Sequence, residues 1–391
     1  MILRSCSRRL STIDTLKKKL TQLGEKLEYV DVTSFSAAVG FDGFVDEIIE
    51  VVDKRESFDS YSRMTTIKQF GERISRAAGL STNIEFVPTT VKLGGNGPIM
   101  ANALVCAGVN VSYVGSLGKP NIHPVFLELT ERCREVFSIA EPGHTDALEF
   151  NDGKVMLGKL ESLNDVNWRS MMDVMGEERI KTIFAHADLV APVNWTMTPY
   201  MNEIWQNLLK VLPKTEGKQK PIFFVDLADP EKRKPEDIRE AMELIQKFTP
   251  YYRVALGLNR KEASEIASVL GLTLTDKPEN VELEEIVTAL SDALNLWCVM
   301  VHPTNEAGAV MEGQYAHTVG PFTSQPRLTT GAGDNFNSGF CLGLLLELSL
   351  EQSLMLGKAT SGFYVRNMHS PSFKELKEFV RLWSQRAGED F

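Results

Sequence analysis

The sequence predicts an α/β fold in which a mostly parallel sheet is covered by helices on both faces. Short apolar runs of strand length alternate with helical stretches, a pattern typical of parallel strands joined by crossover helices. The chain has 391 residues, of which 43% are hydrophobic and 24% charged, as in an ordinary globular protein. No internal repeat or linker is visible, so one large domain with a small β excursion is the simplest interpretation.

The expected strands are apolar runs of four to seven residues. They lie at 35–41, 109–114, 182–185, 221–226, 253–258 and 297–301. Residues 149–157 read as a β-hairpin, because the interrupting Asn151-Asp152-Gly153 contains the Asp-Gly pair that favours a tight primed turn. Helices are expected between the strands and before the first one.

The expected helices show apolar residues at three- and four-residue spacing or carry clear end signals. In the first 36 residues Ile13, Leu16, Leu20, Leu23 and Leu27 predict an amphipathic helical extension. The next helix starts with Pro98 in its first turn and ends before Gly108. Further helices are expected at 198–212, 235–248, 260–270 and 281–294 and after residue 334. The domain proper is therefore expected at 37–391.

Composition excludes several classes of function. The net charge of −10 argues against a nucleic-acid surface, which needs clustered Lys and Arg. No apolar run reaches the roughly 18 residues of a membrane span. The five cysteines are scattered without a C-x-x-C pair, which favours reduced thiols in a cytoplasmic protein. Residues 1–12 contain three Arg and no acid, so organellar targeting is a minor alternative.

The most informative motif is the turn Gly331-Ala332-Gly333-Asp334 at the start of a helix. Small residues at a helix start let backbone N–H groups converge on an anion, and the helix dipole adds to the attraction. An aspartate at the same turn is suited to accept the proton of a hydroxyl that attacks a phosphoryl group. The simpler alternative is that Asp334 only caps the helix and the glycines only turn the chain.

Two upstream motifs are candidates for an acceptor site. Gly94-Gly95-Asn96 combines glycines that allow close backbone approach with a side chain that both donates and accepts hydrogen bonds. Asp42 and Asp46 follow the first expected strand and are suited to bind paired hydroxyls. Helix capping at Asn96 and solvent-facing turn acids are the alternatives.

A fourth motif, Asn259-x-x-Glu262, begins a helix directly after a strand. The two side chains are suited to organise a water-coordinated Mg²⁺, which touches few protein groups. A capping box fits the same spacing. No dinucleotide fingerprint accompanies these motifs, because Met100 stands where the third glycine would be, which disfavours a nucleotide-dependent dehydrogenase.

Taken in order, these motifs resemble the pfkB, or ribokinase-like, family of carbohydrate and nucleoside kinases. TTGAGDNFNSGF at residues 329–340 is close to the family's D-T-x-G-A-G-D-x-F-x-x-G, and the resemblance spans about residues 37–370. It implies a three-layer α/β/α sandwich with a small β-sheet lid, drawn here from parts of 44–93 and 147–160. It also implies transfer of the γ-phosphate of ATP, with Mg²⁺, to a hydroxyl of a small sugar or related polyol.

The resemblance also implies a role for each motif. Asp334 is the expected base, and the Gly331–Asp334 turn is the expected anion hole, formed by the amides of Ala332, Gly333 and Asp334. The residues expected to bind the nucleotide and its Mg²⁺ are Asn259, Glu262 (through water), Thr330, Thr304 and Gly308. Those expected to bind the acceptor are Asp42, Asp46, Gly94, Gly95 and Asn96.

The chain departs from the family pattern at three places. Leu328 replaces the Asp that helps form a monovalent-cation site, which puts cation activation in doubt. The loop from His302 to Gly308 is one residue longer than the family's nucleotide loop. The N-terminal helix and the long 47–93 segment are additions that are candidates for a homodimer interface or substrate choice. These departures keep a second hypothesis open, a weak or inactive relative that binds sugar or nucleotide as a regulator.

Overall fold

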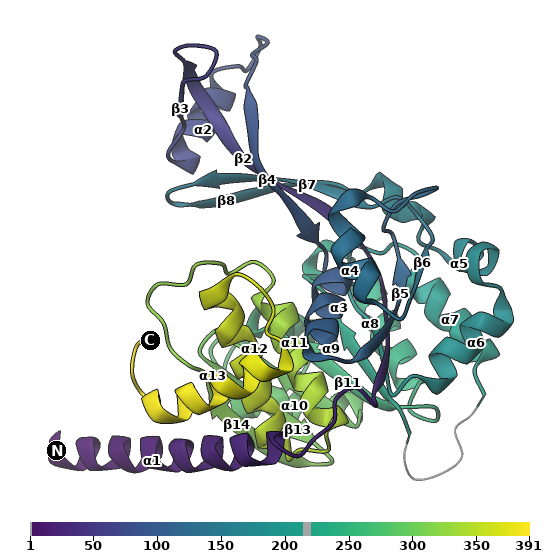
Figure 1. The fold of residues 1–391 in the computed structure, drawn as a ribbon, viewed down its shortest axis with the longest axis vertical. Helices are drawn as coiled ribbons and strands as arrows, with labels where there is room; N and C mark the ends of the chain where they lie inside the picture. The colour runs from purple at the N-terminus through teal and green to yellow at the C-terminus, as the bar shows by residue number, and fades with distance from the viewer. Residues whose placement is uncertain (1, 214–219) are drawn as a thin grey trace.

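The structure is a computed structural model that describes residues 2–213 and 220–391, with side chains from residue 13 onward. A nine-stranded sheet with the order β14-β13-β12-β11-β10-β9-β1-β5-β6 forms the middle of the body (Figure 1). Neighbouring strands from β12 to β6 are parallel, and β13 and β14 form an antiparallel edge. The strands are β1 Ser36–Phe41, β5 Asn110–Gly115, β6 Glu135–Ser138, β9 Leu189–Pro192, β10 Ile222–Asp226, β11 Arg253–Leu258, β12 Cys298–Val301, β13 Glu306–Met311 and β14 Gln314–Val319.

Helices cover both faces of this sheet because successive side chains of a strand point to opposite faces. Phe223 and Val225 pack in one hydrophobic cluster, and Ile222 and Phe224 pack in the other. The first cluster includes α5 Trp168–Met175, α6 Glu177–His186, α7 Met201–Val211, α8 Pro235–Gln246, α9 Arg260–Leu270 and α10 Leu283–Leu294. The second includes α1 Ile2–Leu27, α3 Asn96–Ala107, α4 Leu127–Arg132, α11 Ala332–Leu345, α12 Leu350–Asn367 and α13 Phe373–Arg386. The expected three-layer α/β/α arrangement is confirmed.

A second sheet projects from the body, at the top of Figure 1. It consists of β2 Phe44–Arg55, β3 Tyr61–Arg63, β4 Phe86–Gly94, β7 Gly143–Phe150 and β8 Gly153–Lys159, with α2 Ile67–Ser75 beside it. A separate small core that includes Ile49, Phe70 and Phe150 holds α2 against the strands. Strands β7 and β8 form the expected hairpin, in which Phe150 pairs with Gly153.

The N-terminal helix α1 packs along α13 and is part of the core on its face of the sheet (Figure 1). Leu20, Leu23 and Leu27 have no exposed surface, as their spacing predicts. Ion pairs join α1 and Glu28, the residue that follows it, to both neighbouring helices, Lys19 to Glu351 of α12 and Glu28 to Arg381 of α13. Since these pairs are partly exposed, the buried leucines hold α1 in place.

One expected strand is wrong. Residues 182–185 form the last turns of α6, and the strand of this unit is β9, a few residues later. Thr182, Ile183 and Phe184 have strand propensity, but Ile180, Ile183 and Phe184 are buried at helical spacing. The apolar periodicity of the longer segment therefore outweighs the propensity of the short run.

No helix within the described ranges is both long and apolar enough to cross a membrane. Cys106, Cys133, Cys298 and Cys341 are free thiols, and Cys6 lies outside the described side chains.

Candidate active site

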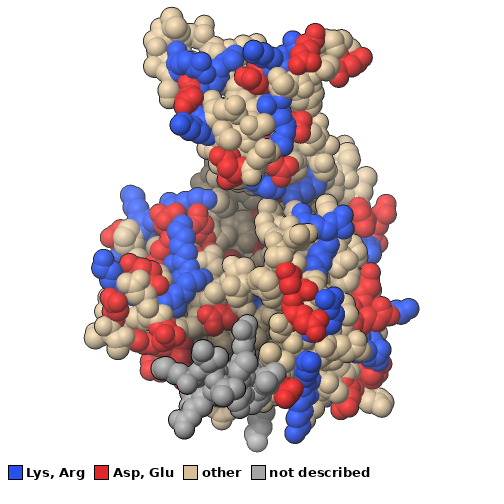
Figure 2. All heavy atoms as spheres, turned by 90° about the vertical axis from the view of Figure 1, so that its left-hand side faces the viewer, with Lys and Arg blue, Asp and Glu red and all other residues tan. Residues whose placement is uncertain are grey.

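Polar side chains gather where the parallel strands of the main sheet end. Asp42 follows β1, Asn194 follows β9, Asp226 ends β10, and Asn259 follows β11. Because parallel strands all end at the same edge of a sheet, the fold brings these residues together. On the surface a hollow opens between the second sheet and the body (Figure 2).

Asp42 has no exposed surface, and its carboxylate is held by three protein donors. The backbone amides of Asn96 and Gly97 donate to it at 3.0 and 2.8 Å, and the side-chain amide of Asn194 at 2.6 Å. Burial raises its pKa to about 6, against the effect of these hydrogen bonds. The structure therefore places Asp42 beneath the start of α3, where it fixes Asn96, and not at the surface of the hollow.

The glycines of the Gly94-Gly95 motif make room for carboxylates of the protein itself. A Cβ at Gly94 would lie 2.4 Å from the carboxylate oxygens of Asp46. A Cβ at Gly95, where φ is +94°, would lie 2.7 Å from Asp42. Both distances are too short for a side chain to fit. The carboxylates of Asp46 and Asp42 therefore require glycine at these two positions.

Asp46 lies on β2, between β4 and β7. It faces Lys92 across one strand pair and Thr145 across the other. Burial raises the pKa of Asp46, while the hydroxyl of Thr145 and the charge of Lys92 act in the opposite direction. Asp46 therefore comes from the second sheet, whereas Asp42 belongs to the body.

Asp334 lies in the first turn of α11, three residues after Gly331 caps the helix in a left-handed conformation with φ of +89°. The expected Ala332 amide donates to the Thr329 carbonyl at 3.1 Å, so it is already used within the turn. The amides of Gly333 and Asp334 lack intrahelical acceptors at this position and are available to an anion. Burial and the nearby charges of Asp226 and Asp42 raise the pKa of Asp334 well above its usual range. A carboxyl group with a raised pKa holds a proton more strongly than an exposed one, which favours a role in proton transfer.

Asn96, the first residue of α3, connects the two motifs. Its side-chain amide donates to Oδ1 of Asp334 at 2.8 Å, and this hydrogen bond opposes the rise in the pKa of that carboxyl. The glycine-rich motif and the Gly331–Asp334 turn are therefore two sides of one site.

Asp226 and Glu262 place more negative charge next to this turn. Burial raises the pKa of Asp226 to about 6 and that of Glu262 to about 7, and each is raised further by a neighbouring carboxylate. Asn337 donates its amide to Asp226 at 2.7 Å, while its own amide oxygen is buried without a hydrogen-bond partner in the structure. Crowded carboxylates beside an unpaired amide oxygen are the donor set that a hard divalent cation prefers, so these residues fit Mg²⁺.

Asn259 and Glu262 form the capping box that the spacing allows. The Asn259 side chain accepts from the Glu262 amide at 3.0 Å, and the Glu262 side chain accepts from the Asn259 amide at 2.8 Å. The second oxygen of Glu262 accepts from the Asp229 amide. The capping role and a role near Mg²⁺ are compatible, because the cap holds Glu262 in place beside Asp226. Glu262 is only 4% exposed there.

A cavity of about 490 Å³ extends from the Gly331–Asp334 turn toward the 302–305 loop. Its lining includes Asn259, His302, Pro303, Thr304, Asn305, Gly320, Pro321, Phe322, Thr329, Ala332, Gly333, Phe336, Lys358, Ser361 and Gly362. The expected residue Thr304 is among them. Gly308 does not line the cavity, because it lies within β13 against Tyr315. Thr330 does not line it either, and its carbonyl accepts from the Tyr364 hydroxyl at 2.8 Å.

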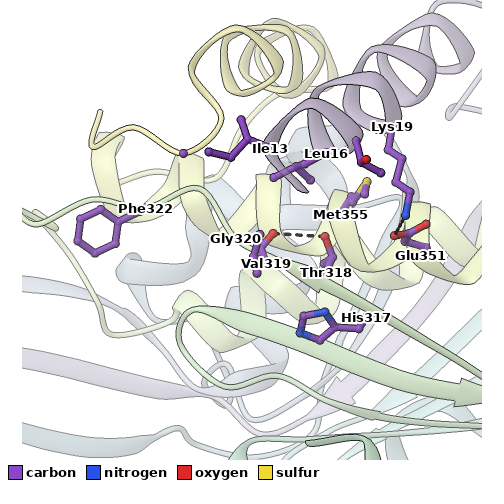
Figure 3. A pocket seen from close by; sticks show the side chains of 12 residues that line it. Ile13, Leu16, Lys19, His317, Thr318, Val319, Gly320, Phe322, Glu351 and Met355 are labelled. Carbon is purple, nitrogen blue, oxygen red and sulfur yellow. Dashed lines mark hydrogen bonds and ion pairs between the residues drawn. The ribbon is translucent and has the colours of Figure 1, made fainter. Parts of the chain in front are cut away.

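A larger groove of about 710 Å³ lies outside this site, between α1, β14 and α12 (Figure 3). It shares Gly320 and Phe322 with the 490 Å³ cavity. Its ionisable side chains already have partners, since Lys19 pairs with Glu351 and the His317 ring contacts the Glu306 carboxylate at 2.8 Å. The groove therefore lacks a cluster of buried carboxylates like the one at the strand ends.

Sequence reasoning missed Asp226, Asn194, Asn337 and Lys358. Asp226 carried a signal, because it is the last residue of an expected strand in a fold whose ligands bind at strand ends. Asn194 follows β9, the strand that the sequence misplaced. Asn337 and Lys358 are helical residues that only the packing of α11 and α12 brings to the site.

Comparison with known proteins gives consistent matches. A family model described as prokaryotic ketohexokinase matches residues 12–383. A ketohexokinase of Haloferax volcanii is 31% identical over 343 residues, which cover 87% of this chain and 89% of that protein. A ribokinase of Thermotoga maritima has a TM-score of 0.61 at 15% identity, covering 89% of this chain and 99% of its own. An Arabidopsis thaliana ribokinase, solved with ribose and ATP, has a TM-score of 0.60 at 15% identity and covers 89% and 98%.

Proposed function

The chain belongs to the prokaryotic ketohexokinase family and is an ATP-dependent sugar kinase of ribokinase-like fold, and on this premise we propose a ketohexose as its acceptor and Asp334 as its base. The acceptor class is suggested by the Haloferax volcanii relative, which is named a ketohexokinase. The observation that supports the base most directly is the Asn96–Asp334 hydrogen bond, which joins the acceptor motif to the phosphoryl-transfer turn. Family membership favours this working enzyme over the regulator considered above.

In the proposed step a hydroxyl oxygen of the sugar attacks the γ-phosphorus of ATP. An O–P bond forms, the bond between the γ-phosphorus and the β–γ bridging oxygen breaks, and ADP leaves. The hydroxyl proton passes to Asp334, whose raised pKa suits it to accept a proton. The free amides of Gly333 and Asp334, in the turn that begins at Gly331 and Ala332, and the dipole of α11 stabilise the charge on the transferring phosphoryl group.

We assign Mg²⁺ to the side of the turn where Asp226 and Glu262 lie. Bound there, the ion would neutralise the phosphate charge that otherwise meets these buried acids. Asn337 would offer its unpaired amide oxygen, and Glu262 would act through water while Asn259 holds it in place.

For the acceptor we propose Asp46 and Asn96 as the direct contacts. Asp42 acts through the α3 start that it caps, and Gly94 and Gly95 act by making room for the two carboxylates. Since Asp46 lies on the second sheet and Asn96 on the body, we propose that a sugar bound between them draws that sheet down as a lid.

The nucleotide is assigned to the 490 Å³ cavity, which starts at Ala332 and Gly333 and ends at the loop with Thr304. A volume of this size is within the range of pockets that bind small molecules.

Two further proposals concern the protein as a whole. The free thiols support a cytoplasmic location, and a homodimer remains a prediction that light scattering can check.

The test is ATP turnover with Mg²⁺ and a panel of ketohexoses, aldohexoses, pentoses, sugar acids and nucleosides, followed as ADP release. A kcat/KM for a ketohexose well above all others is expected. Preference for another acceptor would overturn the substrate proposal while leaving the kinase activity in place. No transfer to any acceptor would revive the regulator hypothesis.

A further inference from the structure

Lys358 is a lysine buried inside the wall of the proposed nucleotide cavity. Its side chain is 6% exposed, although it carries an ammonium group on helix α12. The ammonium donates to the carbonyl oxygens of Pro303 at 2.6 Å and Thr304 at 3.2 Å. Both acceptors belong to the loop that departs from the expected nucleotide motif by its extra residue.

Burial of a lysine is costly, so its surroundings indicate what it does. In the part of the chain that the structure describes, Lys358 forms no ion pair, and the carboxylate that influences it is Glu306, which pairs with His317. Its Nζ lies 5.2 Å from the centre of the Phe336 ring, a favourable position for a cation. The ammonium is therefore bound by two carbonyls and a ring, as a small inorganic cation would be.

The two walls of the cavity meet at this lysine. On one side, a Cβ at position 320 would lie 3.1 Å from Cδ of Lys358. The glycine at this position therefore makes room for the aliphatic part of the lysine side chain. The amide of Gly320 also donates to the Asn305 carbonyl at 2.7 Å, which ties the 302–305 loop to the segment after β14. On the other side, the ring of His302 stacks on Phe336 with the centroids 4.8 Å apart.

We propose that Lys358 is a positioning residue for the nucleotide, an internal cation that holds the Pro303 and Thr304 carbonyls and so shapes the wall against which ATP binds. This inference rests on the proposed assignment of ATP to that cavity. It explains why the altered loop keeps a defined shape: the ammonium crosslinks the loop to α12. The sugar site lies on the other side of the Gly331–Asp334 turn and does not depend on this contact.

The charge of Lys358 changes near neutral pH, which gives the proposal a second readout. Burial lowers its pKa to about 7, and Glu306 opposes the decrease. The other titratable group that faces it is His302, whose pKa is lowered to about 3 and which therefore stays neutral. The ammonium is present below pH 7 and is lost as pH rises, so the loop is held more firmly at pH 6 than at pH 8.

The test compares Lys358→Met and Lys358→Arg with the wild type. Methionine keeps the unbranched shape without the charge, and the KM for ATP is expected to rise about tenfold while the KM for the sugar changes little. Arginine stays charged at all relevant pH values, so this variant should keep the low KM for ATP. In the wild type the KM for ATP should rise between pH 6 and 8, whereas in the arginine variant this dependence should be weaker.

Ser361→Trp separates this proposal from the assignment of the cavity. It fills the same cavity from α12 without removing a donor to Pro303 or Thr304. If Ser361→Trp leaves the KM for ATP unchanged, the nucleotide lies elsewhere and the cavity assignment fails. If Ser361→Trp raises that KM but Lys358→Met does not, only the role of Lys358 is overturned. If Lys358→Met raises the KM for ATP and the KM for the sugar equally and also lowers the Tm, the lysine has only a structural role.

Discussion

The side-chain amide of Asn96 donates a hydrogen bond of 2.8 Å to the carboxylate of Asp334, across a sequence separation of 238 residues. Asn96 is the first residue of α3, and Asp334 is in the first turn of α11. Two helix starts thus meet, with an amide donor on one and a carboxylate on the other. A sugar hydroxyl bound by Asn96 would lie next to Asp334, the proposed base.

The first prediction concerns Asp334 itself. Asp334→Asn removes the proton acceptor but keeps the size and polarity of the side chain. We expect kcat to fall by about 10²- to 10⁴-fold with little change in the KM for the sugar. Initial rates at saturating ATP measure this, with Asp292→Asn on the exposed side of α10 as the matched control. Full activity in Asp334→Asn would show that another group takes the proton.

The second prediction concerns the partner of Asp334. Asn96→Asp replaces a donor with a fourth carboxylate near Asp334, Asp42 and Asp226, so the free energy of unfolding should fall by about 1–3 kcal/mol. Repulsion among these carboxylates raises their pKa values in the folded state above those in the unfolded state. The variant is therefore stable at low pH, where the carboxyl groups are protonated, and loses stability as pH rises through the folded pKa values. Urea denaturation at pH 5 and 8 checks this against Asn96→Ser, which adds no charge. An equal loss at both pH values would contradict the electrostatic explanation.

The third prediction tests the metal side. Glu262→Gln should raise the Mg²⁺ concentration for half-maximal turnover by about tenfold, because it removes the buried carboxylate that we propose organises the ion's waters. Glu265→Gln, one turn later on α9, is the control. Glu265 belongs to a cluster with Asp229 and Glu231 in which Lys261 already supplies the positive charge. The same Mg²⁺ dependence in both variants would argue against Glu262.

The fourth prediction concerns monovalent cations. Turnover should be the same in potassium, sodium and tetramethylammonium chloride at equal ionic strength. Leu328 supplies no carboxylate, and the Thr330 carbonyl already accepts from the Tyr364 hydroxyl at 2.8 Å. Tyr364→Phe frees that carbonyl and tests whether the hydroxyl is what keeps a cation away. Several-fold activation of the wild type by potassium would refute the prediction.

The fifth prediction concerns α1. Leu23→Ala should lower the free energy of unfolding by about 2–5 kcal/mol, because it opens a cavity in the core between α1 and α13. Leu382→Ala on α13 is the control, since that side chain is 41% exposed and its loss should cost little. Urea denaturation of both variants measures the difference. Similar small effects would mean that α1 is only loosely attached.

The sequence predicted the order of most strands and helices of the main sheet because local periodicity and end signals determine them. Residues 253–258 and 260–270 are a strand and a helix with the expected bounds. It failed at 182–185, where β-branched and aromatic residues occur at helical spacing. It also left out the β13–β14 edge and the course of the second sheet, whose short strands are defined by their partners more than by their own pattern.

For the site, the sequence by itself determined the chemical groups: a helix-start turn with Asp334, a glycine-rich motif with Asn96, and Asn259 with Glu262. Only the tertiary structure decided how they act together. It showed that Gly94 and Gly95 leave room for the carboxylates of Asp46 and Asp42. It also placed the Asp226 carboxylate beside the Asn337 amide, and it buried Lys358 under the 302–305 loop. The reason is physical. A motif specifies local backbone geometry and side-chain chemistry, whereas burial, repulsion between carboxylates and the capture of a loop by a distant lysine arise only when separate segments pack together.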